Sequence, residues 1–459
     1  MVFKLSLINL LIILLKLYKF SYCYLIFPFK TRQIEIKGAE DNLALLLRSL
    51  IYNHIYIEIE IGEPKQTVEA FLSLESTEFY LSEKTKNDLR TNCSNPMIFD
   101  VNSSLSKFFD KNLSNSLEIT NRTKSKYREN KGNISNDLMH FTSHNKEKYI
   151  KRIPFILYNS TMGNRPGVIG LQFIRAIIDQ EFNLIDKLKL NDVINSYYWM
   201  INYTSNNEGN FIIGEQPHFF DPKNFKEENL LIGHPFLYSA MSPYWGLRFD
   251  EILFRGRNFR PYHECYFEYE YNYIFGIFEL ENELDKFFND SIINGTCFKE
   301  KIKYSYDPHT FFYCNKDKYK KNMKYFPPIE FYHREMNYTF ILDYKDLFVE
   351  KYDKLILLIF FEEYGGSWKF GKPFLKKYPF LINQESKVVG FYKREVENIE
   401  TNYILVIKII VIIIGIIILL VIGIFISKFL SENRKKRINT IDDDFDYATK
   451  EDDIENKIN

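Results

Sequence analysis

The chain has 459 residues and a formal net charge of zero, because 60 lysines and arginines balance 60 aspartates and glutamates. Such a balance lacks the basic excess that nucleic-acid binding needs, so we expect no nucleic-acid partner. The length is sufficient for one large hydrophobic core or for two medium ones, and two lobes would fit.

An apolar segment stands at the start of the chain. Lys4 precedes an apolar run from Leu5 to Leu15, and Ser21-Tyr22-Cys23 places small residues at the positions that signal peptidase reads. This order is typical of a secretory signal peptide, here residues 1–23, and the mature chain would then begin near Tyr24.

A second apolar segment lies near the other end. The residues from Ile409 to Ile426 carry no charge, which predicts a membrane-spanning helix within residues 403–427. A basic run, 434–437, follows it, and the positive-inside rule then places the tail, residues 428–459, in the cytosol. The sequence therefore predicts a type I single-pass membrane protein of the secretory pathway or cell surface, whose ectodomain is lumenal or extracellular.

Cysteine use agrees with an oxidising compartment. Once Cys23 leaves with the signal peptide, an even number of cysteines remains, which fits disulfide formation. No spacing of cysteine and histidine resembles a zinc site, so we expect no metal, and nothing calls for a cofactor. Candidate N-glycosylation sites, recognised as Asn-x-Ser/Thr, are Asn92, Asn102, Asn112, Asn121, Asn133, Asn159, Asn202, Asn289, Asn294 and Asn337.

The region between the apolar segments is rich in β-strand patterns. Residues 55–61 alternate isoleucine with tyrosine or glutamate, as a half-buried strand does. The Asn-, Ser- and Lys-rich region from Thr91 to Asn136 lacks such a period, so we expect loops there that hold no core residues.

The most informative motif begins in this region. The residues from Ile61 to Gln66 read Ile-Gly-Glu-Pro-Lys-Gln, and seven residues after Gln66 comes Ser-Leu-Glu-Ser-Thr, starting at Ser73. This stretch resembles the pepsin-like aspartic peptidase family, in which Ile-Gly-x-Pro-x-Gln runs at the same spacing into Asp-Thr-Gly-Ser-Ser. The first residue of that second motif is one of the family's two catalytic aspartates, and Ser73 stands in its place.

The resemblance returns in family order along the chain. The most specific match, from Trp368 to Tyr378, reads Trp-Lys-Phe-Gly-Lys-Pro-Phe-Leu-Lys-Lys-Tyr, against the family's Trp-x-Leu-Gly-x-x-Phe-Leu-x-x-Tyr. The other matching segments are Gly167–Leu171, Phe182–Leu190, Tyr197–Ile201, Glu208–Gly214 and Tyr244–Ile252. In all, the resemblance covers roughly Tyr52 to Tyr392.

This resemblance implies a fold that is all-β dominated, a bilobal pepsin-like fold of two β-barrel-like lobes around a cleft, to which the C-terminal transmembrane helix is added. Residues 51–217 would form the N-terminal lobe and residues 218–396 the C-terminal lobe. The preceding residues, 24–50, would form a pro-like or extension segment.

The resemblance also assigns roles to single residues. Tyr127 lies where the family's flap hairpin carries a tyrosine that covers the substrate. Cys297 and Cys314 lie where the family often closes a loop with a disulfide, and Cys93 and Cys265 are then left to pair by arithmetic alone.

The chemistry of the family is missing from the sequence. Aspartic peptidases use two carboxylates about 3 Å apart, which share one proton and activate a water molecule. The Ser73 hydroxyl cannot act as such a base, and Glu75 replaces a glycine that lets two loops pack closely. The second motif should fall between Cys265 and Gly276, where Glu268 or Tyr269 takes the catalytic place, depending on register. Neither Asp-Thr-Gly nor Asp-Ser-Gly occurs anywhere in the chain.

Two interpretations of the glutamates near the second site stay open. Glu268 and Glu270 would form either the solvent face of an alternating strand, with Phe267, Tyr269 and Tyr271 facing inward, or the acidic floor of a cleft that binds a basic peptide. The alternation favours the first interpretation.

Two functions follow. One is a membrane-anchored pseudo-aspartic-peptidase, whose ectodomain serves binding, adhesion or complex assembly with a protein or peptide partner at the lumenal or extracellular face. The alternative is a divergent but active aspartic endopeptidase that acts on peptides or proteins. Loss of both aspartates favours the first function, so we expect no peptidase activity.

Overall fold

Strands dominate the structure, a computed structural model. It describes residues 24–32, 36–40, 42–51, 54–82, 99–100, 103–109, 132–143, 146, 148–158, 166–173, 182–235, 244–259, 263–304, 307–362, 367–393 and 410–431. The chain separates into two compact units, residues 1–393 and 394–459.

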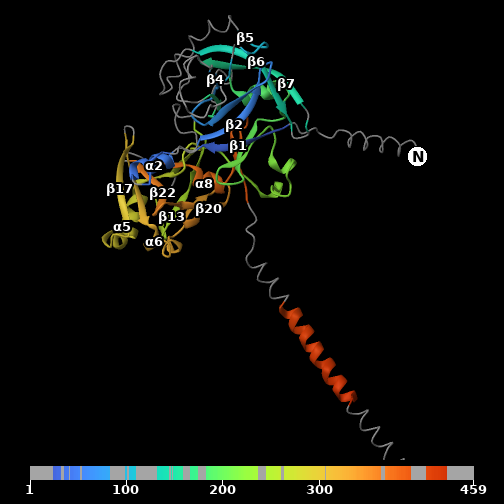
Figure 1. The fold of residues 1–459 in the computed structure, drawn as a ribbon, viewed down its shortest axis with the longest axis vertical. Helices are drawn as coiled ribbons and strands as arrows, with labels where there is room; N and C mark the ends of the chain where they lie inside the picture. The colour runs from blue at the N-terminus through green and yellow to red at the C-terminus, as the bar shows by residue number, and fades with distance from the viewer. Residues whose placement is uncertain are drawn as a thin grey trace, which may run out of the picture. The chain divides into compact units, whose positions relative to one another are not determined.

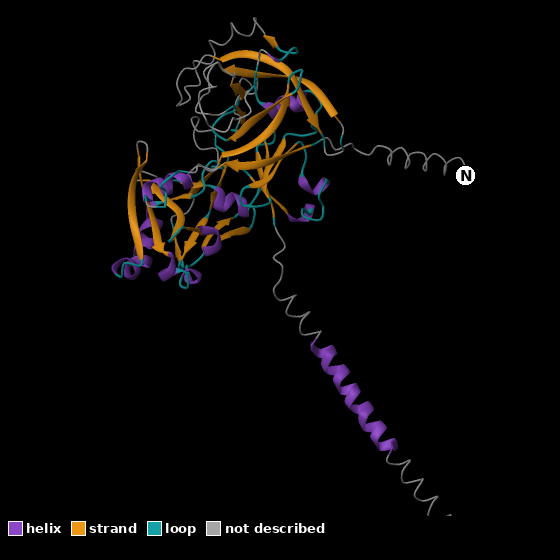
Figure 2. Ribbon diagram, viewed as in Figure 1, coloured by secondary structure: helices purple, strands orange, loops and turns teal. Residues whose placement is uncertain are grey.

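A 13-stranded sheet builds the first lobe of unit 1 and extends to the second lobe (Figures 1 and 2). The strands nearest the end of unit 1 join this sheet, because β24 pairs with β9 in antiparallel fashion. In spatial order the strands are β11 (Leu230–Gly233), β25 (Val388–Tyr392), β24 (Phe380–Asn383), β9 (Tyr198–Tyr203), β10 (Glu208–Ile213), β1 (Leu25–Arg32), β2 (His54–Ile61), β3 (Gln66–Ser73), β8 (Gly167–Gly170), β4 (Phe79–Ser82), β7 (Lys148–Tyr158), β6 (Gly132–Thr142) and β5 (Phe108–Phe109).

Two smaller sheets build the second lobe. The larger one has the order β12 (Gly246–Phe249), β15 (His263–Phe267), β23 (Trp368–Phe370), β16 (Ile274–Gly276), β22 (Lys354–Glu362), β18 (Asp307–Asn315) and β17 (Cys297–Tyr304), with β21 (Phe348–Lys351) beside β22. The smaller one has the order β14 (Arg257–Asn258), β13 (Glu251–Phe254), β19 (Ile329–His333) and β20 (Tyr338–Leu342).

Helices are short and gather mainly around the second lobe (Figure 2). Among the described residues of unit 1, the α-helices are α2 (Leu43–Ile51), α4 (Leu184–Leu190), α5 (Phe278–Ile293), α6 (Lys316–Tyr319), α7 (Tyr344–Leu347) and α8 (Lys372–Lys377). Single 3₁₀ turns cover Pro217–Phe219, Glu227–Asn229 and Met323–Tyr325.

The hairpin of β2 and β3 shows why the sequence forms these strands. The isoleucines of β2 are buried at every second position, while Glu58 and Glu60 are exposed, so the predicted alternation is confirmed. The chain turns at Gly62, whose φ of 84° favours glycine, and β3 returns with Gln66 opposite Ile61.

Each lobe has one strand threaded between two others. Strand β8 lies between β3 and β4, and β23 lies between β15 and β16. A Cβ atom on Gly170 would stand 2.4 Å from backbone atoms of Thr77 and Glu78, and one on Gly371 would stand 2.0 Å from the carbonyl oxygen of Tyr273. The close approach therefore requires glycine at both positions, which lie in two of the segments that match the family.

The residues after Tyr24 are integrated into both lobes. Strand β1 is hydrogen-bonded between β10 and β2 of the large sheet. Helix α2 then packs with apolar residues of the second lobe, including Phe275 and Phe360. The backbone carbonyl of Ile51 accepts a hydrogen bond from the Asn272 N–H at 3.1 Å, so this segment connects the first lobe's sheet to a loop of the second.

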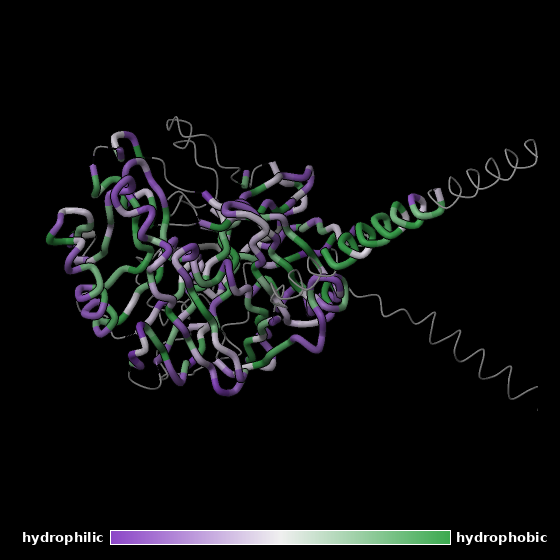
Figure 3. Tube along the Cα trace, turned by 90° about the horizontal axis from the view of Figure 1, so that it is seen from below, coloured by the Kyte–Doolittle hydropathy of each residue, from purple (hydrophilic) through white to green (hydrophobic). Residues whose placement is uncertain are grey.

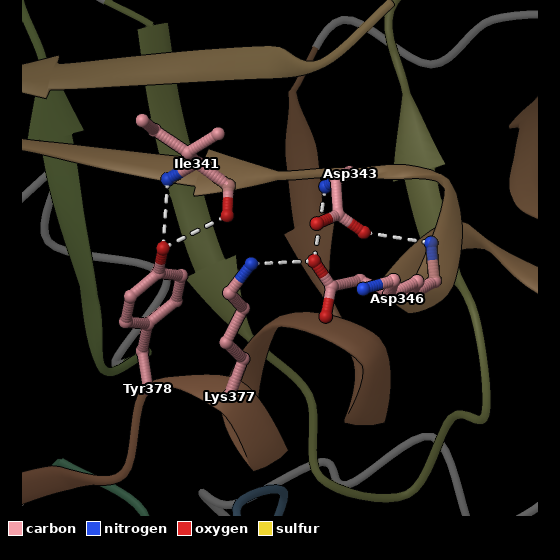
Figure 4. A network of polar contacts seen from close by, with 6 residues as sticks. Ile341, Asp343, Asp346, Lys377 and Tyr378 are labelled. Atoms are coloured by element: carbon pink, nitrogen blue, oxygen red, sulfur yellow. Dashed lines mark hydrogen bonds and ion pairs between the residues drawn. The ribbon is translucent and has the colours of Figure 1, made fainter. Parts of the chain in front are cut away.

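The block from Trp368 to Tyr378 anchors α8 to the neighbouring strand and helix (Figure 4). The Tyr378 hydroxyl donates to the carbonyl of Ile341 and accepts from its N–H, both at 2.8 Å. Lys377 pairs with Asp346 at 2.6 Å, and Asp346 forms a capping box with Asp343 at the start of α7. The most specific sequence match is thus a set of packing and anchoring residues.

One expectation about the loop region was wrong. Phe99 lies in the stretch that we expected to hold no core residue, yet it is fully buried and meets the ring of Phe155 edge-on. In addition, β6 begins at Gly132, inside the same stretch. Phe99 ends the short apolar run Met97-Ile98-Phe99, which is too brief to show a strand or helix period, so the pattern did not predict its burial.

The second unit contains one helix, Ile410–Ser431, within the residues that the structure describes. Its mean hydropathy is 3.5 over an 18-residue window, and Figure 3 shows the apolar character running almost unbroken along it. By length and composition this helix can span a membrane. The predicted signal peptide, residues 1–23, lies outside the described residues.

Candidate functional site

Two loops, one from each lobe, meet at the positions where the pepsin-like family carries its aspartates. Ser73 ends β3 opposite Gly170 of β8. In the second lobe Phe267 lies opposite Phe370, so that Glu268, the next residue, corresponds to Ser73. The register therefore assigns the second catalytic position to Glu268, and Tyr269 does not occupy it.

A buried hydrogen bond joins the two loops. The Ser73 Oγ donates to Glu270 Oε1 at 2.8 Å, and the Glu75 N–H donates to Ser73 Oγ at 3.2 Å. Ser73 is only 2% exposed and Glu270 only 8%. The expectation that the two loops lie together is confirmed, and Glu270 is the residue that makes the contact.

Glutamate occupies the family's glycine position in both loops. Counting two residues on from Ser73 and from Glu268 gives Glu75 and Glu270. Glu270 reaches the first position of the other loop, because its carboxyl accepts from Ser73. The charge of Glu75, which is exposed, acts on Glu268 and raises its pKa. The site thus combines one hydrogen-bonded pair with one electrostatic interaction between the loops.

The carboxyl of Glu268 is held in its neutral form. Burial is the largest cause, and the neighbouring charges of Glu75 and Glu270 add to it, so the pKa of Glu268 rises from 4.5 to about 8. Lys369 acts in the opposite direction, but its ammonium group pairs with Glu362 at 2.8 Å. At neutral pH Glu268 is therefore mostly protonated.

The favoured interpretation of the second site was wrong. Glu268 is only 8% exposed, and residues 268–273 form a loop after β15 instead of an alternating strand. Sequence reasoning also missed the role of Glu270 as the partner of Ser73. A signal for it was present, because both loops, Ser-Leu-Glu-Ser-Thr and Glu-Tyr-Glu-Tyr-Asn, carry glutamate at their third position.

The other residues that the sequence singled out are the four cysteines and the flap-like tyrosine. The Cys297–Cys314 disulfide is confirmed. Cys265 is a buried free thiol, and its proposed partner Cys93 lies outside the described residues, as does the flap-like Tyr127.

The candidate glycosylation sites fall partly within and partly outside the described residues. Asn289, Asn294 and Asn337 are exposed, and Asn202 is half-buried in β9. Asn133 lies in β6. The sequons outside the described residues are Asn92, Asn102, Asn112, Asn121 and Asn159.

Comparison with known proteins supports the fold. The chain is similar to the crystal structure of basic 7S globulin from soybean, with a TM-score of 0.55, 11% sequence identity, and coverage of 81% of this chain and 95% of that one. The fold is therefore pepsin-like and bilobal, with one apolar C-terminal helix added. No family model and no curated protein matches the sequence.

Proposed function

We propose that this protein is a single-pass membrane pseudo-aspartic-peptidase whose ectodomain binds a protein or peptide and does not cleave it. The observation that carries the proposal is the Ser73–Glu270 hydrogen bond. It occupies the place where an aspartic peptidase needs two carboxylates that share a proton and hold a water molecule between them. A serine hydroxyl offers no base there, and the other position holds Glu268, which is neutral near pH 7.

The alternative is an active, divergent endopeptidase, in which Glu268 and Glu270 replace the aspartate pair. Both carboxyls are buried, and a raised pKa is a common property of catalytic acids. Against this alternative, Glu270 is engaged by Ser73, and each glutamate side chain is one methylene longer than the aspartate that the family uses. We therefore favour the binding function.

A peptidase assay decides between the two. The full-length protein in detergent is incubated with a broad peptide library from pH 4 to 7, with and without pepstatin. No pepstatin-sensitive cleavage is expected. The double variant Ser73→Asp/Glu75→Gly should also stay inactive, because the second loop still lacks its aspartate, whereas cleavage by the unchanged protein would refute the proposal.

The apolar helix Ile410–Ser431 and the signal-like start of the chain support a type I orientation in the secretory pathway. Protease treatment of sealed microsomes should then remove only the short tail. Loss of the whole ectodomain would show the opposite orientation.

A further inference from the structure

One mostly buried carboxyl in the paired loops has no hydrogen-bonding partner among the residues that the structure describes. Glu268 is more than nine-tenths buried, and no side chain among the described residues donates a hydrogen bond to its carboxyl. A mostly buried carboxyl without a donor costs free energy, and its oxygens are not fully closed off from solvent. The hydrogen bonds within the described residues therefore leave this group unused, and a ligand can reach it.

The groups that face Glu268 leave it with an excess of negative charge. Acting on its carboxyl are the charges of Glu75, Glu270, Glu362 and Lys369. Lys369, the single cation among them, is bonded to Glu362 and lies over the ring of Phe275. Glu75 is exposed, so the cluster is open to a ligand at that side chain.

We propose that the Glu75, Glu268 and Glu270 carboxyls form a binding site for a lysine or arginine side chain of a peptide partner. The inference rests on the proposed binding function and adds the chemical class of the ligand. A cation at this position would give the Glu268 carboxyl the donor that it lacks, and it would offset the repulsion between three neighbouring glutamates.

Binding of a cation to this site releases a proton. A positive charge next to Glu268 lowers the pKa of its carboxyl, which in the free protein is about 8, so the group ionises when the ligand arrives. Affinity for a basic peptide therefore rises with pH, by up to about tenfold per pH unit between pH 6 and 8.

The test uses the full-length protein in detergent and four pentapeptide libraries with blocked ends. Their central residue is fixed as Lys, Arg, Gln or Glu, and the flanking positions are random over uncharged residues. Retention on the immobilised protein is measured by mass spectrometry at pH 6, 7 and 8. We expect the Lys and Arg libraries to exceed the Gln library by about tenfold or more at pH 8, and by less at pH 6.

Variants connect the result to the site. Glu268→Gln and Glu270→Gln should abolish the preference for basic peptides, and Glu268→Gln should also remove its pH dependence. Glu75→Gln changes an exposed side chain, so it should weaken the preference for basic peptides without affecting folding. Glu251→Gln, an exposed glutamate on β13 of the same lobe, is the matched control and should change nothing.

The possible failures are distinct. Equal retention of the Gln and Lys libraries, or a basic preference that survives Glu75→Gln and Glu268→Gln, overturns this inference and leaves the binding function standing. Cleavage of the library peptides would instead overturn the proposed function itself.

Discussion

Ser73 and Glu270, 197 positions apart in the sequence, are joined by a buried hydrogen bond of 2.8 Å that links the two lobes. Ser73 lies where the pepsin-like family carries its first aspartate, and the bond connects the loop after β3 to the loop after β15. The bond therefore contributes to the packing of the two lobes against each other. Its removal should be measurable as a decrease in the free energy of unfolding.

Ser73→Ala should lower the free energy of unfolding by about 1–3 kcal/mol, because it removes a hydrogen-bond donor from the buried Glu270 carboxyl. Urea unfolding followed by the fluorescence of the buried tryptophans measures this change. Ser103→Ala, which removes an exposed hydrogen bond to Asp100, is the control and should cost less than about 0.5 kcal/mol.

The double variant Ser73→Ala/Glu270→Gln tests whether the two residues act as a pair. We expect a coupling energy of about 1 kcal/mol or more, since residues in direct contact are not additive. Additive effects of the two single substitutions would show that the hydrogen bond contributes nothing.

Gly371→Ala should prevent folding or destabilise the protein by more than about 3 kcal/mol. The new methyl group would stand 2.0 Å from the carbonyl oxygen of Tyr273 and 2.6 Å from that of Tyr271, and backbone atoms cannot rotate away as side chains do. Gly415→Ala, in the apolar helix where no atom lies within 4 Å, is the matched control. Yield of folded protein and thermal unfolding are the measurements, and equal behaviour of the two variants would contradict the threading argument.

The sequence predicts the framework of this fold better than its site. The glycines at 170 and 371 and the Trp368 block could be found because backbone threading tolerates few residue types. The sequence signal for Glu270 is only the glutamate that both loops carry at their third position. Its hydrogen bond with Ser73 does not follow from that pattern, because it depends on how two loops from different lobes meet. The burial of Phe99 depends in the same way on tertiary packing.

Stability should depend on pH through Glu268. Its pKa is about 8 in the folded protein and about 4.5 when unfolded, so the folded state holds the extra proton between these values. The stabilising contribution of this proton is present at low pH and is lost as pH rises towards 8, by at most about 1.4 kcal/mol per pH unit.

Glu268→Gln cannot ionise, so its stability relative to the unchanged protein should rise from pH 5 to pH 8 in urea unfolding. The comparison is needed because burial lowers the pKa of His218 and His333, which destabilises the protein as pH falls below about 6.5. Those histidines are common to both proteins and cancel in the difference. The stability difference between Glu251→Gln and the unchanged protein should not vary with pH. If the difference for Glu268→Gln also did not vary with pH, the Glu268 carboxyl would already be ionised in the folded protein.

The segment from Tyr24 to Ile51 should stay attached after the chain is cut within it. A site for a specific protease, inserted between Lys37 and Gly38, falls at a turn where Gly38 has a φ of 76° and no atom near its Cβ position. Strand β1, which lies before the cut, is hydrogen-bonded on both edges, so both pieces should co-elute in gel filtration and separate only in denaturant. Release of the piece before the cut under native conditions would identify it instead as a removable leader.

The variant Leu47→Ala tests the contribution of α2, which buries this residue. It should lower the free energy of unfolding by about 2–5 kcal/mol. If the helix holds the second loop through the Ile51–Asn272 hydrogen bond, the variant should also weaken the coupling energy between Ser73 and Glu270.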